Sequence, residues 1–362
     1  MVTAQKTETS NLIIGTYTQS GKSEGLYVYE FNSLTGGFTY KAKAAGIVNP
    51  SFLTISRDQK YVYAVNETGR QTPGGISSFE FNASSGDLKF LNKVKSMGDD
   101  PCYISIDKKG KYVFVGNYSG GNLAAFKVQP NGSLYDAMQV IQHEGSGVNK
   151  SRQEKSHVHS TVISPDQKYL FAVDLGTDKV TSYRIRKGNF PNILTEQQPA
   201  LSVAAGSGPR HLTFHPDGKT AYLVHELTGD VSAYRYQKGR LTPIQTISML
   251  APAFKGDIGA ADIHVSADGK FLYASNRGDA NEIVIYTINA DGKLSLAGRH
   301  STLGKGPRNF AIDPSGKFLL AANQNSDEIV VFNRDTETGL LSDSGKKIQI
   351  GQPVCLVFAP IQ

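Results

Sequence analysis

The sequence predicts an all-β protein, a seven-bladed β-propeller with four antiparallel strands in each blade. Three observations support this fold: a turn motif that recurs six times, terminal strands that complete one another, and a composition suited to strands and tight turns. The 362 residues include 37 glycines, 17 tyrosines and 17 phenylalanines. Aromatic residues favour strands, and glycine favours the turns that join them.

The repeat is marked by a lysine in a polar turn between two apolar runs. The runs are short, as in ISPDQKYLFAV, and third and fourth strands follow further on. Four short strands in each unit of about fifty residues are typical of a propeller blade. Successive turn lysines are 51, 57, 51, 51 and 47 residues apart: Lys60, Lys111, Lys168, Lys219, Lys270 and Lys317.

The two ends of the chain are expected to form the seventh blade together. Near the C-terminus, PVCLVFAP has the pattern of a first strand with nothing after it. Near the N-terminus, NLIIGTYT, GLYVYEFN and FTYKAKAA have the pattern of strands two to four. Their pairing would close the ring and cover two open sheet edges. We therefore expect one propeller domain over residues 11–362, preceded by an N-terminal tail over residues 1–10.

Side chains at the ends of the first two strands of each blade should meet at one mouth of the central channel. Charge gathers there in one sector, and the long loop HEGSGVNKSRQEKSHVHS can overhang it. Asparagine dominates the position six residues after the lysines, with Asn276 and Asn323 in the last two blades. The positions nine before and seven after the lysines include Cys102, His159, Arg210, Arg308, Glu67, Tyr118, Glu226, Arg277 and Gln324.

Composition and motifs exclude several classes of function. No apolar run approaches the roughly 18 residues of a membrane helix, and the scattered lysines lack the basic stripe of a nucleic-acid binder. Two cysteines cannot build a thiolate metal cage. Because the chain is expected to be all-β, it offers no strand-to-helix nucleophile elbow of the GxSxG type, and Walker and HExxH motifs are absent. We expect no metal and no other cofactor, and the formal net charge of +6 fits an anionic ligand.

The chain resembles the seven-bladed lactonase family, which includes bacterial 6-phosphogluconolactonases of the propeller type and fungal 3-carboxy-cis,cis-muconate lactonizing enzyme. The motifs that carry the resemblance are GSGVNKSRQEKSHVHS, HELTGDV, GPRHLTFHPDGK and SADGKFLYASNRG. The resemblance implies hydrolysis of a sugar lactone, most simply 6-phosphogluconolactone. It also implies a catalytic and substrate-binding set: His159, Arg210, Glu226 and Arg277.

Within this set, Glu226 is the candidate general base for water, provided that its pKa is raised. His159 would protonate the leaving oxygen or stabilise the oxyanion, and His157 is its rival in the same motif. Arg210 is counted with the catalytic residues. Seven residues are expected to bind the substrate's anion and hydroxyl groups: Arg277, His157, Arg308, Arg152, Asn276, Asn323 and Gln324.

Two other functions remain open from the sequence. One is a muconate-type cycloisomerase that closes or opens a lactone without water. The other is a non-enzymatic propeller that binds a partner at its basic mouth. A monomer in the cytoplasm is the default expectation, although the first ten residues could also be the remainder of a removed export signal.

Overall fold

Each turn lysine lies in a tight hairpin between the first and second strands of one sheet. In the third hairpin, Ser164 Oγ donates to Asp166 Oδ1 at 2.6 Å and accepts the backbone N–H of Tyr169 at 3.0 Å. Gln167, between them, has a φ of 58°. Serine and aspartate stabilise turns through such local bonds. The polar turn residues of the repeat therefore fix where one strand ends and the next begins.

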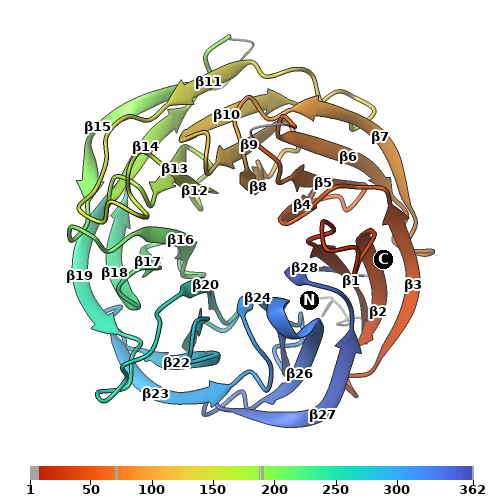
Figure 1. Ribbon diagram of the computed structural model, residues 1–362, viewed down its shortest axis with the longest axis vertical. Coiled ribbons are helices and arrows are strands. Elements are labelled where there is room, and N and C mark those ends of the chain that lie inside the picture. Colours follow the sequence, from red (N-terminus) through yellow and green to blue (C-terminus); the bar gives the residue numbers. More distant parts are fainter. Residues whose placement is uncertain (1–7, 70–71, 187, 189–190, 361–362) are drawn as a thin grey trace, which may run out of the picture.

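The computed structural model describes residues 8–69, 72–186, 188 and 191–360, and these form seven four-stranded antiparallel sheets around a channel (Figure 1). The first three blades after the N-terminal strands are formed by β4 (Leu53–Ile55), β5 (Tyr61–Asn66), β6 (Gly75–Phe81) and β7 (Leu88–Lys95); β8 (Pro101–Ile106), β9 (Tyr112–Asn117), β10 (Asn122–Lys127) and β11 (Gln139–Gln142); and β12 (Val158–Ile163), β13 (Tyr169–Asp174), β14 (Lys179–Ile185) and β15 (Leu194–Ser202).

Three further blades follow in chain order. They comprise β16 (Pro209–Phe214), β17 (Thr220–His225), β18 (Asp230–Gln237) and β19 (Arg240–Ser248); β20 (Ala260–Val265), β21 (Phe271–Asn276), β22 (Glu282–Ile288) and β23 (Leu294–Ser301); and β24 (Pro307–Ile312), β25 (Phe318–Asn323), the 3₁₀ helix η1 (Gln324–Ser326), β26 (Glu328–Arg334) and β27 (Leu341–Gln349).

The remaining blade closes the ring as predicted. It contains β1 (Thr9–Thr16), β2 (Gly25–Asn32), β3 (Phe38–Ala45) and the C-terminal β28 (Pro353–Pro360). β28 pairs antiparallel with β1, with Ile13 opposite Val357. The expected boundary of the tail was wrong in one detail, because β1 begins within residues 1–10. Residues 1–7 lie outside the described part of the chain.

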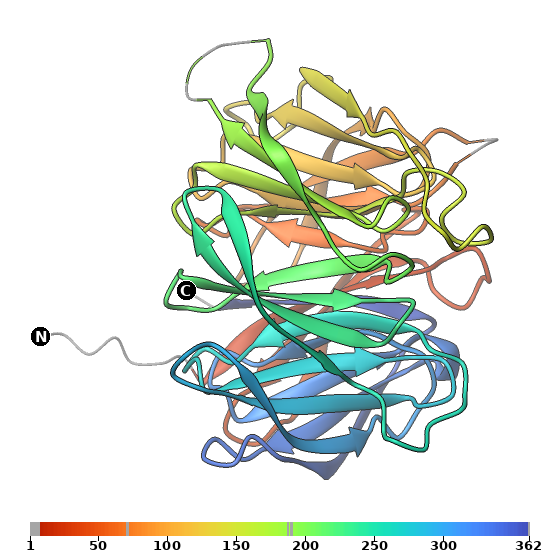
Figure 2. The same cartoon turned by 90° about the vertical axis from the view of Figure 1, so that its left-hand side faces the viewer.

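The blades are joined by apolar packing between neighbouring sheets. The second strands of the six internal blades are almost wholly buried, as their apolar sequences predict. Tyr63, Tyr222 and Tyr273 lie in three of these strands and donate their hydroxyl groups to backbone carbonyls of the next blade. The strands run between the two faces of the disc, where the loops gather (Figure 2). This rigid ring positions the channel mouth.

Candidate active site

The first strand of most blades is irregular where it reaches the mouth. In six blades its pairing with the second strand skips a residue or more, for example between Pro209 and His211. A β-bulge leaves such a residue unpaired and re-aims its side chain. The bulges therefore explain why the position nine before each lysine serves the site. The skipped residues include Cys102, His159, Arg210, Ala261 and Arg308.

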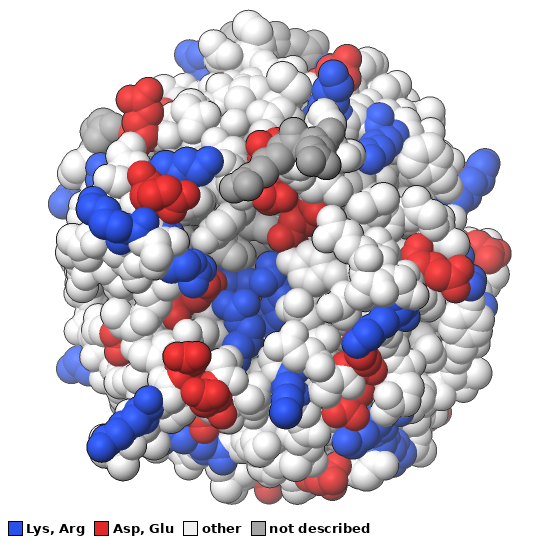
Figure 3. Space-filling model, in the orientation of Figure 1, with Lys and Arg blue, Asp and Glu red and all other residues white. Residues whose placement is uncertain are grey.

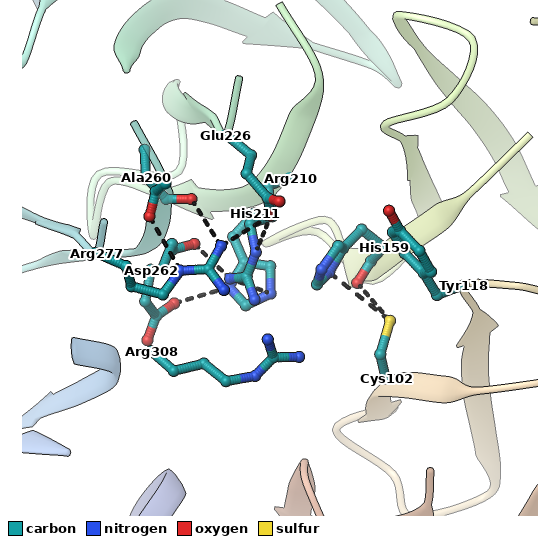
Figure 4. A network of polar contacts seen from close by, with 12 residues as sticks. Cys102, Tyr118, His159, Arg210, His211, Glu226, Ala260, Asp262, Arg277 and Arg308 are labelled. Atoms are coloured by element: carbon teal, nitrogen blue, oxygen red, sulfur yellow. Dashed lines mark hydrogen bonds and ion pairs between the residues drawn. The ribbon is translucent and has the colours of Figure 1, made fainter. Parts of the chain in front are cut away.

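Glu226, directly after β17, lies at the centre of an arginine cluster. Its side chain is 7% exposed. Oε1 lies 2.5 Å from Nη2 of Arg152, and Oε2 lies 2.9 Å from Nε of Arg210 and 3.1 Å from Nη2 of Arg277. The Nε–H of Arg210 does not point along its contact, which is an ion pair without a hydrogen bond. Basic side chains accordingly cover the centre of the disc (Figure 3), and Figure 4 shows them from close by.

The charge state of Glu226 follows from these contacts. Burial raises the pKa of its carboxyl group, but Arg277, Arg210 and Arg152 outweigh burial and hold that pKa well below its usual range. A carboxylate surrounded by cations is a weak proton acceptor. Glu226 therefore does not meet the condition, a raised pKa, under which it was a candidate general base. Its carboxylate holds three guanidinium groups in place.

Arg210 is the most enclosed of the three arginines, at 1% exposure. Burial lowers its pKa to about 10, so the side chain is still a cation at neutral pH. Nη1 donates to the carbonyl of Ala261 at 2.5 Å and lies 3.3 Å from Nε2 of His211. No contact with the described residues involves Nη2. That N–H group is the one with which Arg210 can bind a ligand.

A second carboxylate lies across the mouth. The hydroxyl group of Tyr17 is 2.9 Å from both oxygens of Glu67, and Ser51 donates to Oε2. Nη2 of Arg308 is 3.9 Å from the same oxygen, and the guanidinium group lies over the Tyr17 ring at 5.4 Å. Arg308 thus adds a fourth cation to the mouth.

The structure places His159 in the channel wall, 4% exposed, with its ring 5.3 Å from those of Tyr118 and His211. Nδ1 lies 3.7 Å from the thiol of Cys102. Burial first, and then Arg210, lower the pKa of His159 well below its usual value. The imidazole is therefore neutral at pH 7. Of the two roles expected for His159, a neutral N–H group favours stabilisation of the oxyanion over protonation of the leaving oxygen.

His157, the rival histidine, is occupied by protein groups. Its ring stacks on Tyr118 at 4.4 Å, Nδ1 lies 3.0 Å from the Tyr118 carbonyl, and Nε2 lies 3.2 Å from Glu154. Because both ring nitrogens are used, His157 braces the overhanging loop. The same loop brings Arg152 to Glu226.

The resemblance found in the sequence is borne out by comparison with known proteins. The family model for "Lactonase, 7-bladed beta-propeller" matches residues 11–358. The chain belongs to this lactonase family. It is 41% identical to a 6-phosphogluconolactonase of Formosa agariphila, over 91% of this chain and 94% of the relative. It is 36% identical to the 6-phosphogluconolactonase of Bacillus subtilis, over 95% and 97%.

A solved structure that is similar to this chain has a different name. The periplasmic gluconolactonase of Pseudomonas aeruginosa superposes with a TM-score of 0.94 at 40% identity, covering 98% of this chain and all of the other. Among the described residues of this lactonase, no helix is long and apolar enough to cross a membrane. Nor do the described residues contain a group of three or more His, Cys, Asp or Glu side chains that could hold a metal ion.

The asparagines expected to bind substrate do not reach the mouth of the lactonase. Asn276 and Asn323 are both fully buried. Asn276 Oδ1 accepts the backbone N–H of Gly259, and Asn323 Nδ2 donates to the carbonyl of Thr302. These amides anchor the loops between blades, so their assignment as substrate ligands was wrong. Gln324 begins η1, and its assignment stays a prediction.

The sequence reasoning missed the channel residues just beyond the bulges. Strict alternation along a strand puts successive side chains on opposite faces. A bulge breaks that rule, so the residue after it also points into the channel. The available signal was a polar residue at the same position of three first strands, in the sequences GPRHL, GAADI and GPRNF. The residues concerned are His211, Asp262 and Asn309.

Proposed function

We propose that this protein hydrolyses 6-phosphogluconolactone to 6-phosphogluconate at the channel mouth. The observation that carries the proposal is the convergence of Arg152, Arg210 and Arg277 on the buried carboxylate of Glu226. Guanidinium groups bind phosphate oxygens in pairs, and a site with several of them has surplus positive charge for an anionic substrate. Two relatives named 6-phosphogluconolactonase support the choice of substrate.

The site residues have distinct roles in this proposal. Arg152 and Arg277 bind the phosphate, because their side chains are the more exposed members of the cluster. Arg210 polarises the lactone carbonyl through Nη2, and the neutral N–H of His159 supports the oxyanion. Glu226 holds the guanidinium groups in place for the incoming anion. Arg308 extends the positive surface towards Glu67.

The test compares freshly prepared 6-phosphogluconolactone with unphosphorylated gluconolactone, each with and without EDTA. We expect turnover to favour the phosphorylated lactone and to be indifferent to EDTA. Arg210→Ala should lower kcat/KM at least about thirtyfold, since truncating a buried charge partner costs about 2–5 kcal/mol. Equal turnover of both lactones would replace the substrate by an unphosphorylated one. Absence of turnover on either lactone would favour a muconate-type lactone or partner binding.

The cellular location follows from the substrate in this proposal. A phosphorylated sugar carries charge that prevents unaided passage through a membrane. We therefore propose that the protein acts in the cytoplasm as a monomer that binds a small anionic lactone. A preference for gluconolactone, the substrate in the name of the periplasmic relative, would favour an exported enzyme instead.

A further inference from the structure

A second layer of polar side chains lies beneath the arginines and has no role in the mechanism above. His211 follows the bulged Arg210, and Asp262 stands at the equivalent place in β20. His211 Nδ1 lies 2.8 Å from Oδ1 of Asp262, which is 3% exposed. His264 Nε2 and Asn309 Nδ2 contact Oδ2 at 2.8 and 2.5 Å.

The contacts of Asp262 fix the state of His211. Burial raises the pKa of Asp262, but His264 and His211 outweigh burial and hold it well below its usual range. The backbone N–H of Ile263 also donates to Oδ1, at 3.0 Å. An ionised carboxylate only accepts hydrogen bonds. The Nδ1 of His211 therefore carries its hydrogen, and Nε2 keeps a lone pair, which faces Nη1 of Arg210 at 3.3 Å.

That lone pair belongs to a residue that lines the channel. A small hollow, with room for about one water molecule, is bounded by Ser51, Cys102, Arg210, His211, Arg308 and Asn309. Burial and Arg210 lower the pKa of His211 to about 4, so its ring is neutral at pH 7. The titratable and charged groups facing the ring are Arg210 from its own strand, Asp262 from β20, Arg308 from β24, His159 from β12 and Tyr103 from β8.

We propose that His211, oriented by Asp262, is the proton acceptor for the hydrolytic water. The inference rests on the proposed lactonase reaction. The water oxygen bonds to the lactone carbonyl carbon while its proton passes to His211 Nε2. The ring C–O bond of the resulting oxyanion then breaks, and Nε2–H returns the proton to the departing oxygen. The products are a carboxylic acid and a hydroxyl group, with no other reactant consumed.

His211 fits this role better than the other candidates. Asp262 would stabilise the imidazolium that forms on Nε2, as a buried aspartate does in Ser-His-Asp triads. His159 has no carboxylate partner among the described residues. The carboxylate of Glu226 is held by three cations. His211 is thus the neutral base whose protonated form has a built-in counter-ion.

The experiment measures steady-state hydrolysis of 6-phosphogluconolactone by wild type, His211→Gln and Asp262→Asn. His143→Gln is the matched control, because His143 also pairs with a buried aspartate, Asp174, at 3.1 Å but does not line the hollow. We expect kcat to fall at least a hundredfold in His211→Gln with KM within threefold. Asp262→Asn should lower kcat by a smaller factor, and His143→Gln should stay within threefold of wild type.

Two further measurements separate proton transfer from structure. Added imidazole should restore part of the turnover of His211→Ala, which a structural role would not predict. ¹⁵N spectra of the wild-type histidines should show His211 with hydrogen on Nδ1 at neutral pH. An active wild type whose His211→Gln variant keeps a third of its kcat, or a His211 with hydrogen on Nε2, would overturn this role alone. An inactive wild type would overturn the lactonase proposal and this role with it.

Discussion

Glu226 and Asp262 are two buried carboxylates in neighbouring layers of one channel, and their partners differ in kind. Glu226 is surrounded by guanidinium groups, which are charged at neutral pH. Asp262 is surrounded by two imidazoles, an amide and a backbone N–H. The first arrangement stores positive charge for an anion. The second orients a group that can gain and lose a proton.

As the pH falls, protonation of the buried histidines should destabilise the protein before protonation of Glu226 and Asp262 does. Burial is the leading cause that lowers the pKa of His211 and of His225 to about 4. Unfolded histidines bind protons below pH 6.5, so the stability due to neutral burial is present above pH 6.5 and lost as pH falls towards 4. Each residue accounts for about 3 kcal/mol over that window.

His264 changes the stability with the opposite sign, and the two carboxylates change it in a lower pH range. Burial lowers the pKa of His264, but Asp262 outweighs burial and raises it, so His264 gives stability at low pH that is lost as pH rises. The lowered pKa values of Asp262 and Glu226 add acid sensitivity only below their unfolded values near pH 4. Urea unfolding at several pH values should show that the free energy of unfolding decreases as the pH is lowered from 6.5. A flat profile down to pH 4.5 would contradict the neutral burial of His211 and His225.

Glu226→Gln tests the charge-storing layer. It removes the counter-ion of Arg210 while leaving the shape of the side chain, so the free energy of unfolding should fall by about 3 kcal/mol. Glu80→Gln is the control, because Glu80 pairs with Lys89 at 3.3 Å and both side chains are more than half exposed. It should cost less than about 1 kcal/mol. Equal losses in the two variants, measured by urea unfolding, would mean that the cluster is no stronger than a surface ion pair.

The sequence predicted the ring well because the repeat itself marks where strands end and turns begin. Polar turns such as Ser164–Gln167 and the apolar second strands recur at similar spacing, and the missing strands at the two ends are complementary. It also predicted the arginine cluster, since residues that depart from a repeat are not needed to build it. His159, Arg210, Glu226 and Arg277 do meet at the mouth.

The rest depended on details that a repeat does not encode. The bulge at Arg210 brings His211 into the channel against strict alternation. Glu226 could act as a general base only with a raised pKa, but three arginines, not Arg210 alone, hold that pKa down. Asn276 and Asn323 occupy the predicted end of their strands, but their side chains turn back to backbone groups. Spacing placed the backbone, whereas local hydrogen bonds decided which side chains face the ligand.

Arg152→Ala tests whether Arg152, in the overhanging loop, binds the substrate or only lies near it. Arg152 is 43% exposed and reaches Glu226 from the overhanging loop. Its loss should raise KM for 6-phosphogluconolactone about tenfold, equivalent to about 1.4 kcal/mol, with little change in stability. Lys150→Ala is the control, because Lys150 bonds only to the Gly147 carbonyl of its own loop among the described residues. A similar KM in both variants would show that Arg152 does not contact the phosphate.

The smallest effects should come from the asparagines behind the mouth. Asn323→Ala leaves the carbonyl of Thr302 without its buried partner, so stability should fall by about 2 kcal/mol, while kcat and KM stay within twofold. Gln324→Ala, one residue nearer the surface, should leave stability unchanged. Thermal unfolding and steady-state kinetics on both variants separate the two positions. A raised KM in Asn323→Ala at unchanged stability would mean that the Asn323 amide contacts the substrate. The substrate site would then extend beyond the residues around Glu226 and Asp262.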